Sequence, residues 1–505
     1  MIQFLRNLSF ALIVLFNTQQ ALYATWTSPP IQFASSTNKD LEPQIAADHE
    51  ENAVAVWAEA VMDNSIINAA IYTNGAWGPV ETISSTTGIL NTPRVVMYAN
   101  GSAVATWHVG FNGAIESAIY NGATWSLIST GISASDTGAF LATNGTGQAI
   151  MGWTETAQAS IALFDGSNWG APTLISSTDT VIPETAPAVC INASGKAGAT
   201  WIITGDVTRS STLSSGSWTL PQTLSTGNDN FEPTVQIDSQ GHIIALWYSG
   251  SFPADTYTAT FNGTYWSAPT ILFDAIFLAF PALAVAPNGL AVALGLDNNS
   301  NVLAANYNGS QWSTPQIIST APTGGVGSQL LGVAIDPSGD GYAVWTMNSG
   351  STHEVLSSFF TNGTWSAPIL VASSDVGVIR ESVALSPYNL LFAIWQSVQI
   401  GYTGNIFTSQ YPLISPPQSF SGKVVSVRFL TQTDLIHKLL WTPSISPNVV
   451  SYQITRNGQV IATVPNSAPY IYEDHNRNKK QDDVYTIVGL DSSGVQTPAL
   501  TVTLQ

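Results

Sequence analysis

A repeat with a spacing of 46 to 50 residues constrains the fold of this chain more than any other feature. Its first element is a run of alternating apolar residues that ends in tryptophan, as in "AVAVW" and "AVATW". One gap has double length, and Gly295 of "AVALG" stands there in the tryptophan position. With it the sequence contains eight copies, which end at Trp57, Trp107, Trp153, Trp201, Trp247, Gly295, Trp345 and Trp395.

A second element follows each of the first seven copies. It consists of a turn such as "NGAW" or "DGSNW" and a short stretch such as "SAPTIL". The eighth copy lacks it, but "TWTSPPIQ" at 25–32 has the same character near the other end of the chain. The tryptophans of the seven turns are Trp77, Trp125, Trp169, Trp218, Trp266, Trp312 and Trp365.

Each repeat predicts four short strands, which in the first copy are "PQIAAD", "NAVAVWAE", "IINAAIY" and "WGPVETIS". Asn-Gly and Asp-Gly pairs supply the positive φ that the tight turns between them need. Four-stranded units of this length, repeated many times, are typical of a β-propeller. A proline recurs in the last strand, and because proline cannot donate to a ladder, we expect that strand at the outer edge of each blade. These prolines are Pro79, Pro172, Pro221, Pro269, Pro315 and Pro368.

The N-terminal "TWTSPPIQ" predicts how the propeller closes. An open ring would expose strand edges and apolar faces on its first and last blades. If this stretch supplies the outer strand of the blade that contains Trp395, both chain ends join one sheet. We therefore expect an all-β, eight-bladed β-propeller of four-stranded blades over residues 25–412. A seven-bladed ring with one degenerate extra hairpin is the alternative.

Residues 1–24 have the pattern of a secretory signal peptide, with Arg6 before the apolar run "LSFALIVLF" and Ala24 at a cleavage position. The apolar run is short for a membrane span, and a retained signal anchor is the alternative. Cys190 is the only cysteine, so the chain cannot form an internal disulfide, and we expect it to be a small core residue. The sequence thus predicts a secreted, cell-surface or periplasmic protein.

The charge balance excludes some partners. The chain has 13 Lys plus Arg against 32 Asp plus Glu, which gives a formal net charge of -19. Binding to nucleic acid or to an anionic membrane surface requires a basic footprint that this composition lacks. We expect no nucleic-acid partner and, after processing, no integral membrane span.

The last part of the chain differs from the repeat. After a linker at 413–420, residues 421–505 contain Trp441, Tyr452, the hairpin "RNGQVIA" and Tyr485 before "VGLDSSG". In order and spacing these features resemble a fibronectin type III domain. The resemblance implies a seven-stranded β-sandwich with Trp441 in its core, and it implies no catalytic activity.

The repeat itself, as in "DPSGDGYAVW", resembles repeats of secreted bacterial proteins, most of which are uncharacterised. This resemblance covers residues 25–412. It implies a propeller fold and export, but no particular activity.

Candidate binding residues lie where the chain passes from an outer strand to the next inner strand. These connections converge on one face at the mouth of the central channel, which is the usual place for ligands. The charged residues there are Glu42, Arg94, Glu232, Arg380 and Glu381. The alternative is that they are solvated loop charges.

One connection, "FDAIFLAF" at 273–280, is almost entirely apolar. It precedes the copy in which Gly295 replaces tryptophan, and the missing side chain would leave a costly void. We expect Phe277 or Phe280 to fill that space. An exposed contact patch for a partner is the alternative.

The turns "DGSNW" and "NGTYW" are reminiscent of the Asp box of sialidases, but the full pattern is absent. A sialidase-like site also needs three arginines around a carboxylate, with an acid and a nucleophile. Residues 25–412 contain only Arg94, Arg209 and Arg380, and Arg209 is expected on a third strand, away from the channel.

The histidines show no metal-ligand spacing, and "DHNRNKKQDD" at 474–483 departs from a calcium loop. We expect no cofactor and no metal site. The sequence as a whole predicts a non-catalytic, monomeric binding or scaffolding protein that recognises a glycan or a protein. A sialidase-like glycoside hydrolase is the alternative.

Overall fold

The computed structural model divides the chain into two compact units between Leu413 and Ile414, here called the N-terminal unit and the C-terminal unit. The described residues form strands and turns, with no helix and hence none able to cross a membrane. The prediction of an all-β protein is confirmed. The structure describes residues 26–33, 39–48, 52–61, 64–85, 88–110, 113–134, 139–177, 179–182, 186–225, 230–250, 254–276, 281–320, 331–349, 352–361, 363–374, 377–386, 390–398, 404–412, 417, 419–428, 433–444, 449–478, 482–490, 497 and 499–504.

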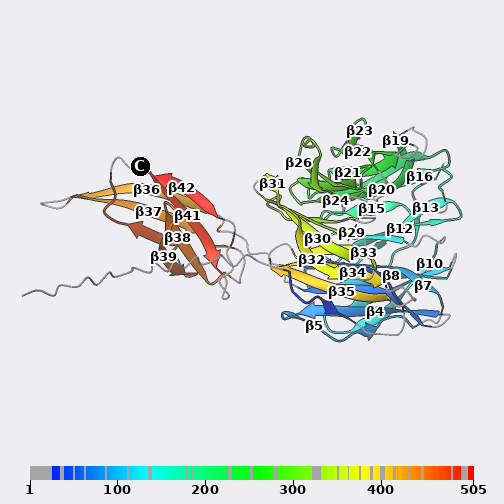
Figure 1. Ribbon diagram of the computed structural model, residues 1–505. Helices are drawn as coiled ribbons and strands as arrows, with labels where there is room; N and C mark the ends of the chain where they lie inside the picture. The colour runs from blue at the N-terminus through cyan, green and yellow to red at the C-terminus, as the bar shows by residue number, and fades with distance from the viewer. Residues whose placement is uncertain are drawn as a thin grey trace, which may run out of the picture. The chain divides into compact units, whose positions relative to one another are not determined.

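The N-terminal unit consists of antiparallel strand groups that follow one another along the chain (Figure 1). Each group contains the strands of one sequence repeat. The strands are β1 (Ile31–Gln32), β2 (Lys39–Ala47), β3 (Ala53–Val61), β4 (Asn64–Thr73), β5 (Ala76–Trp77), β6 (Glu81–Thr82), β7 (Leu90–Met97), β8 (Ala103–Val109), β9 (Ala114–Tyr120), β10 (Trp125–Ser133), β11 (Ala139–Thr143), β12 (Ala149–Glu155), β13 (Gln158–Phe164), β14 (Thr173–Leu174), β15 (Ala188–Ile191), β16 (Ala197–Ile203), β17 (Val207–Ser214), β18 (Ser217–Trp218), β19 (Gln222–Ser225), β20 (Asn230–Ile237), β21 (Ile243–Ser249), β22 (Ala254–Phe261), β23 (Thr270–Ile276), β24 (Ala282–Val285), β25 (Ala291–Leu296), β26 (Val302–Tyr307), β27 (Gln316–Ser319), β28 (Leu331–Ile335), β29 (Gly341–Ser349), β30 (Thr352–Thr361), β31 (Thr364–Trp365), β32 (Ile369–Ser374), β33 (Gly377–Ser386), β34 (Leu390–Val398) and β35 (Gly404–Pro412).

Within a group the strands are paired in chain order, as in β20-β21-β22-β23. The last strand pairs only with the third, so it lies at an edge, where the repeated prolines predicted it. In three groups this strand is two short pieces, and Pro79, Pro221 and Pro368 lie in the breaks between them. The turn before β5 contains Asn74 and Gly75, both with positive φ, as the Asn-Gly pair predicts.

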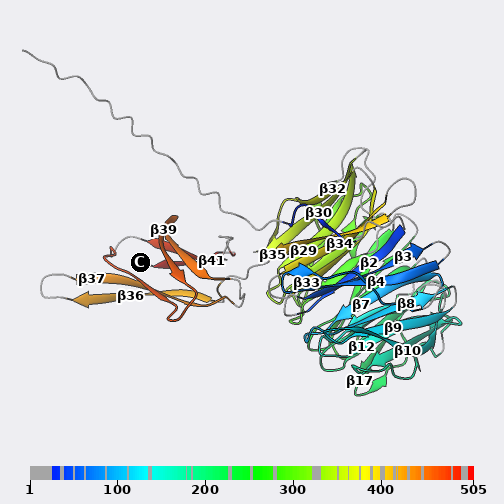
Figure 2. The same cartoon turned by 90° about the horizontal axis from the view of Figure 1, so that it is seen from below.

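The first strands of successive groups lie side by side, in the order β2, β7, β11, β15, β20, β24, β28 and β33. β33 in turn lies beside β2 (Figure 2). The third strand of the last group, β35, pairs antiparallel with β1, so that Ile31 is opposite Thr408. A single parallel pair, Lys39 with Gly404, joins β2 to β35. The two ends of the N-terminal unit therefore share one nine-stranded sheet.

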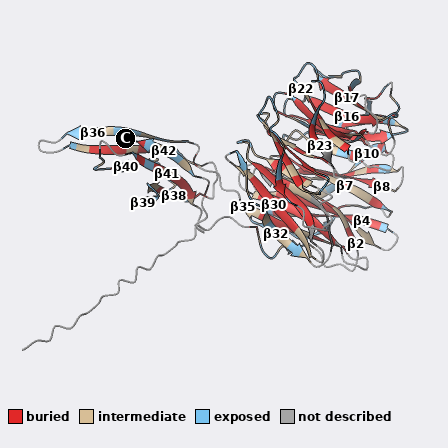
Figure 3. Cartoon of the chain, turned by 45° about the horizontal axis from the view of Figure 1, so that its top comes forward, coloured by how far each residue is buried: buried red, intermediate tan, exposed pale blue. Residues whose placement is uncertain are grey.

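The repeated tryptophans form the core between neighbouring groups, and buried residues run along most strands (Figure 3). Trp107 packs against Val54 and Ile67 of the preceding group, and Trp57 packs against Ile394 of the last group. These side chains are almost fully buried, and so are their neighbours in β3 and β8, because both faces of these second strands are covered. Cys190 is also buried, in the cluster around Trp247.

The space beside Gly295 is filled by Phe273, which lies at the start of the apolar stretch 273–280. A Cβ on Gly295 would lie 2.9 Å from the Phe273 ring, and Phe273 is fully buried. The residues named from the sequence for this role, Phe277 and Phe280, lie outside the described residues. Phe273 reaches the space because β23 extends through it, alongside β22.

The C-terminal unit consists of two antiparallel sheets, ordered β36-β37-β40 and β39-β38-β41-β42. Their shared core is one cluster that contains Trp441, Tyr452 and Tyr485. The strands are β36 (Ser419–Arg428), β37 (Thr433–Thr442), β38 (Ser451–Arg456), β39 (Gln459–Pro465), β40 (Ile471–Asp474), β41 (Asp483–Leu490) and β42 (Leu500–Leu504).

Candidate functional site

The beginnings of several first strands are irregular. The pairing of β2 with β3 shifts between Leu41 and Gln44, and that of β7 with β8 shifts between Asn91 and Arg94. Bulges of this kind re-aim side chains and are common beside functional sites. Glu42 and Thr92, within these bulges, have φ of 55° and 46°. Such conformations are costly for residues other than glycine, asparagine and aspartate, so the surrounding structure must hold them in place.

Glu42 connects two neighbouring strand groups. Its Oε2 atom accepts a hydrogen bond of 2.6 Å from the backbone N–H of Thr92. A carboxylate that accepts a backbone N–H is a strong, charge-assisted partner. The bond therefore fixes the start of β7 against the start of β2.

Arg94 connects β7 to the next group. Its guanidinium carbon lies 5.7 Å from the ring centroid of Phe140 on β11, and its Nη1 donates to the Pro93 carbonyl oxygen at 3.2 Å. Phe140 is 41% exposed, although most phenylalanines are buried. We call Glu42, Thr92, Arg94 and Phe140 the first-strand face.

The other three predicted residues also lie on first strands. Glu232 is inside the bulge of β20, between Phe231 and Thr234, and Arg380 is inside that of β33. Glu381 is opposite Trp395. The side chains of Glu232, Arg380 and Glu381 lie outside the described part of the chain, so only Glu42 and Arg94 are seen in contact with neighbouring groups.

Arg209 lies on β17, the third strand of its group, as predicted. Its Nε and Nη2 atoms donate to the two carboxylate oxygens of Asp179, at 3.1 and 3.2 Å. In this bidentate arrangement the Arg209 guanidinium donates to Asp179 through the same edge that would bind a substrate carboxylate in a sialidase-like site.

Asp40, at the start of β2, is fully buried. Among the described residues neither of its carboxylate oxygens has a hydrogen-bond partner, nor does the indole nitrogen of Trp57. Burial, followed by the Glu59 carboxylate, raises the pKa of Asp40 to about 7, although the nearby Trp57 indole opposes the shift. Asp40 is therefore partly protonated near neutral pH.

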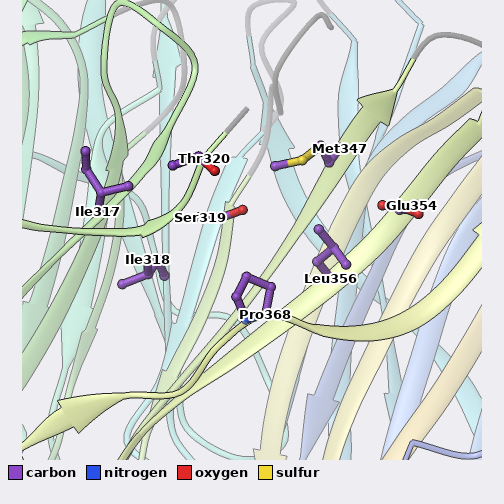
Figure 4. A pocket seen from close by; sticks show the side chains of 8 residues that line it. All are labelled: Ile317, Ile318, Ser319, Thr320, Met347, Glu354, Leu356 and Pro368. Atoms are coloured by element: carbon purple, nitrogen blue, oxygen red, sulfur yellow. The ribbon is translucent and has the colours of Figure 1, made fainter. Parts of the chain in front are cut away.

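A hollow of about 440 Å³ lies between β27 and β30 (Figure 4). Ile317, Ile318, Met347 and Leu356 give it an apolar lining. Of its eight described lining residues only Glu354 is ionisable, so they provide no pair of an acid and a base.

In the described part of the chain, no three or more His, Cys, Asp or Glu side chains gather in a group that could hold a metal ion. The loop at 474–483 begins with Asp474, whose Oδ2 atom accepts hydrogen bonds of 2.6 Å from Tyr485 and from Arg456. The Asp474 carboxylate therefore makes hydrogen bonds within the C-terminal unit, to side chains of β38 and β41. His437 is buried beside it, with Nδ1 3.0 Å from the Tyr485 hydroxyl.

The sequence reasoning did not single out Phe140 or Asp40. Phe140 lies in "AFLAT", which has the ordinary pattern of a core strand, and only the structure reveals its exposure. Asp40 could have been named from the sequence, because it is a second carboxylate only two residues before Glu42, at the start of a predicted inner strand.

No family model and no curated protein matches this chain. Among solved structures it is similar to a protein of unknown function from Dyadobacter fermentans, with 12% identity, a TM-score of 0.41, and coverage of 77% of this chain and 99% of that one. It is also similar to the six-bladed β-propeller lectin of Aleuria aurantia, with 14% identity, a TM-score of 0.34, and coverage of 58% and 100%. A third similar structure is the leech intramolecular trans-sialidase, with 11% identity, a TM-score of 0.36, and coverage of 76% and 70%. All three likenesses are distant, and the propeller-like, all-β architecture follows from the strand pairing of the chain itself.

Proposed function

We propose that this protein is an exported, non-catalytic binding protein that recognises a glycan through the first-strand face. Its N-terminal unit is then an eight-bladed β-propeller closed by β1, and its C-terminal unit a fibronectin type III-like domain. Residues 1–24 direct export and are removed. The protein acts in the periplasm, at the cell surface or outside the cell.

The observation that carries the proposal is the exposed Phe140 ring beside the Arg94 guanidinium. Binding sites commonly combine an aromatic surface with a few fixed polar groups that orient the ligand. The Glu42–Thr92 bond and the two bulges hold this surface on rigid strands. The pairing of Arg209 with Asp179 also favours binding over a sialidase-like reaction, because that arginine is already engaged.

The direct test is a glycan array probed with the purified full-length protein and two variants. Phe140→Ala should reduce binding to the best glycan about tenfold or more, as for a central aromatic contact. Tyr265→Ala is the matched control, because Tyr265 is 64% exposed but lies in the turn after β22, at the other end of the strands. Equal loss in both variants, or in neither, would contradict the proposal.

A second test replaces Arg94, Glu232 and Arg380 together with alanine. Ligand binding should weaken, and a nearly unchanged melting temperature should show that the loss is not one of folding. Hydrolysis of a sialoside or other glycoside by the wild type, abolished by this change, would instead establish the enzyme. Binding that survives the change but is lost without residues 416–505 would assign recognition to the C-terminal unit.

A further inference from the structure

Three positions come together where one strand group packs against the next at the start of the chain. The first position directly follows the tryptophan of one group. The second lies two residues after the tryptophan of the next group. The third is the residue on the first strand of that next group that pairs with the second position. Between the β2–β6 and β7–β10 groups these are Ala58, Val109 and Leu90, and Leu90 is paired with Val109. All three belong to one hydrophobic cluster.

At the contact between the last group and the first, the same three positions are polar. They are Gln396, Glu59 and Asp40, and Asp40 is paired with Glu59. Ile394 shares one hydrophobic cluster with Trp57, and Gln396, two residues further along β34, is on the same side of that strand and therefore also faces the first group. We call Asp40, Glu59 and Gln396 the seam cluster.

The seam cluster contains two independent, fully buried side chains that lack partners. Asp40 and Gln396 are both 0% exposed, and none of their four side-chain polar atoms makes a hydrogen bond within the described part of the chain. A buried polar group in this state costs roughly 1–3 kcal/mol, and more when it is charged. Native structures seldom keep such groups without a bound water or ion.

The counterpart of Asp40 in one other group is an amide, Asn230, whose nitrogen is hydrogen-bonded. Asn230, opposite Ser249, is equally buried. Its Nδ2 atom donates to the Asp206 carbonyl oxygen and to Ser225 Oγ. The chain therefore supplies acceptors for the amide nitrogen of Asn230, whereas among the described residues it supplies no donor for the carboxylate at the equivalent seam position.

We propose that the seam cluster binds a hard divalent cation, for which Ca²⁺ is the best match, and that the ion fastens the last strand group to the first. The cluster offers two carboxylates and an amide carbonyl, the oxygen ligands that Ca²⁺ prefers. A divalent ion also balances two carboxylates that would repel each other when buried. Glu59 is only half-buried and leaves a route to solvent, while its Oε2 is held by Asn68 Nδ2 at 2.6 Å. Water and backbone oxygens complete the coordination.

This inference does not depend on the proposed glycan recognition. Its test is calorimetric titration of CaCl2 into the chelator-treated, full-length protein. One saturable site should be present in the wild type, and Asp40→Asn should weaken it about tenfold or more, because ligand charge sets affinity in such sites. Glu155→Gln is the matched control, since Glu155 also lies two residues after a tryptophan but is exposed, and it should bind like the wild type.

A second variant separates loss of the ion from loss of the fold. The variant that combines Asp40→Leu, Glu59→Val and Gln396→Ala has at the seam the residue types that Leu90, Val109 and Ala58 provide at the neighbouring contact. This protein should fold, bind no Ca²⁺ at the seam, and lose the increase of about 3 °C or more that Ca²⁺ gives the wild-type melting temperature. No saturable binding by the wild type, which is the result expected if ordered water fills the cluster, would overturn the proposal. Unchanged binding by the triple variant would do so as well.

Discussion

Replacing Trp26 with alanine tests whether the N-terminal segment holds the last strand group in place. Trp26 is 5% exposed and belongs to the cluster around Trp395, with its ring centroid 5.6 Å from that of Tyr411. A buried indole removes roughly 200 Å² from water, worth about 5 kcal/mol at 25 cal/mol per Å², and alanine retains part of this. The Trp26 indole nitrogen also donates to Ser357 Oγ at 2.8 Å, but Ser357 keeps a contact with the Ile369 carbonyl oxygen, so its loss adds little. The expected loss is about 3–5 kcal/mol of the free energy of unfolding, the range for large-to-small aromatic changes.

The assay is urea denaturation of the full-length protein, with the midpoint and slope compared between variants. Trp26→Phe should retain most of the stability. Leu220→Ala is the control, since Leu220 is 79% exposed, and it should change stability by less than about 0.5 kcal/mol. A Trp26→Ala protein within about 1 kcal/mol of the wild type would refute the reasoning.

Three further sets of experiments have defined outcomes. Deleting residues 25–34 removes β1 and exposes the edge of β35, so aggregation, measured by light scattering, should increase and the melting temperature should fall. Phe273→Ala should cost about 3–5 kcal/mol, and Gly295→Ala about 1–3 kcal/mol, because the added Cβ meets the Phe273 ring; equal stability of either variant and the wild type in urea would contradict the packing. Burial, above all, lowers the pKa of His437, so below about pH 6.5 the unfolded chain takes up a proton that the folded C-terminal unit does not. Stability is therefore retained above that pH and falls as the pH decreases through it; calorimetric scans between about pH 8 and pH 5 should show this loss, and His437→Gln should reduce it.

The repeat predicted the architecture well because the same physical demand recurs in each copy. Alternating apolar runs that end in tryptophan form second strands whose tryptophans are buried, as at Trp57 and Trp107. Prolines such as Pro79 marked the edge strand because they cannot donate to a ladder. The match of "TWTSPPIQ" to a missing outer strand predicted the pairing of Ile31–Gln32 with β35.

The candidate site was less predictable because it depends on the register between strands. Glu42 and Arg94 could be named as charges near strand starts, but the bulges that aim them, and the partner Thr92, follow from local pairing shifts. The filling of the space at Gly295 by Phe273 depended on how far β23 extends. The seam cluster joins Asp40 to Gln396, which are far apart in the sequence, and becomes visible only when positions relative to each tryptophan are compared across the contact.

Hydrogen exchange with and without the best array glycan tests the central claim, that the first-strand face binds ligand, most directly. Added glycan should slow exchange in β2, β7 and β11, which carry Glu42, Thr92, Arg94 and Phe140, and leave exchange in the C-terminal unit unchanged. Protection confined to β36–β42, or to the hollow between β27 and β30, would contradict it.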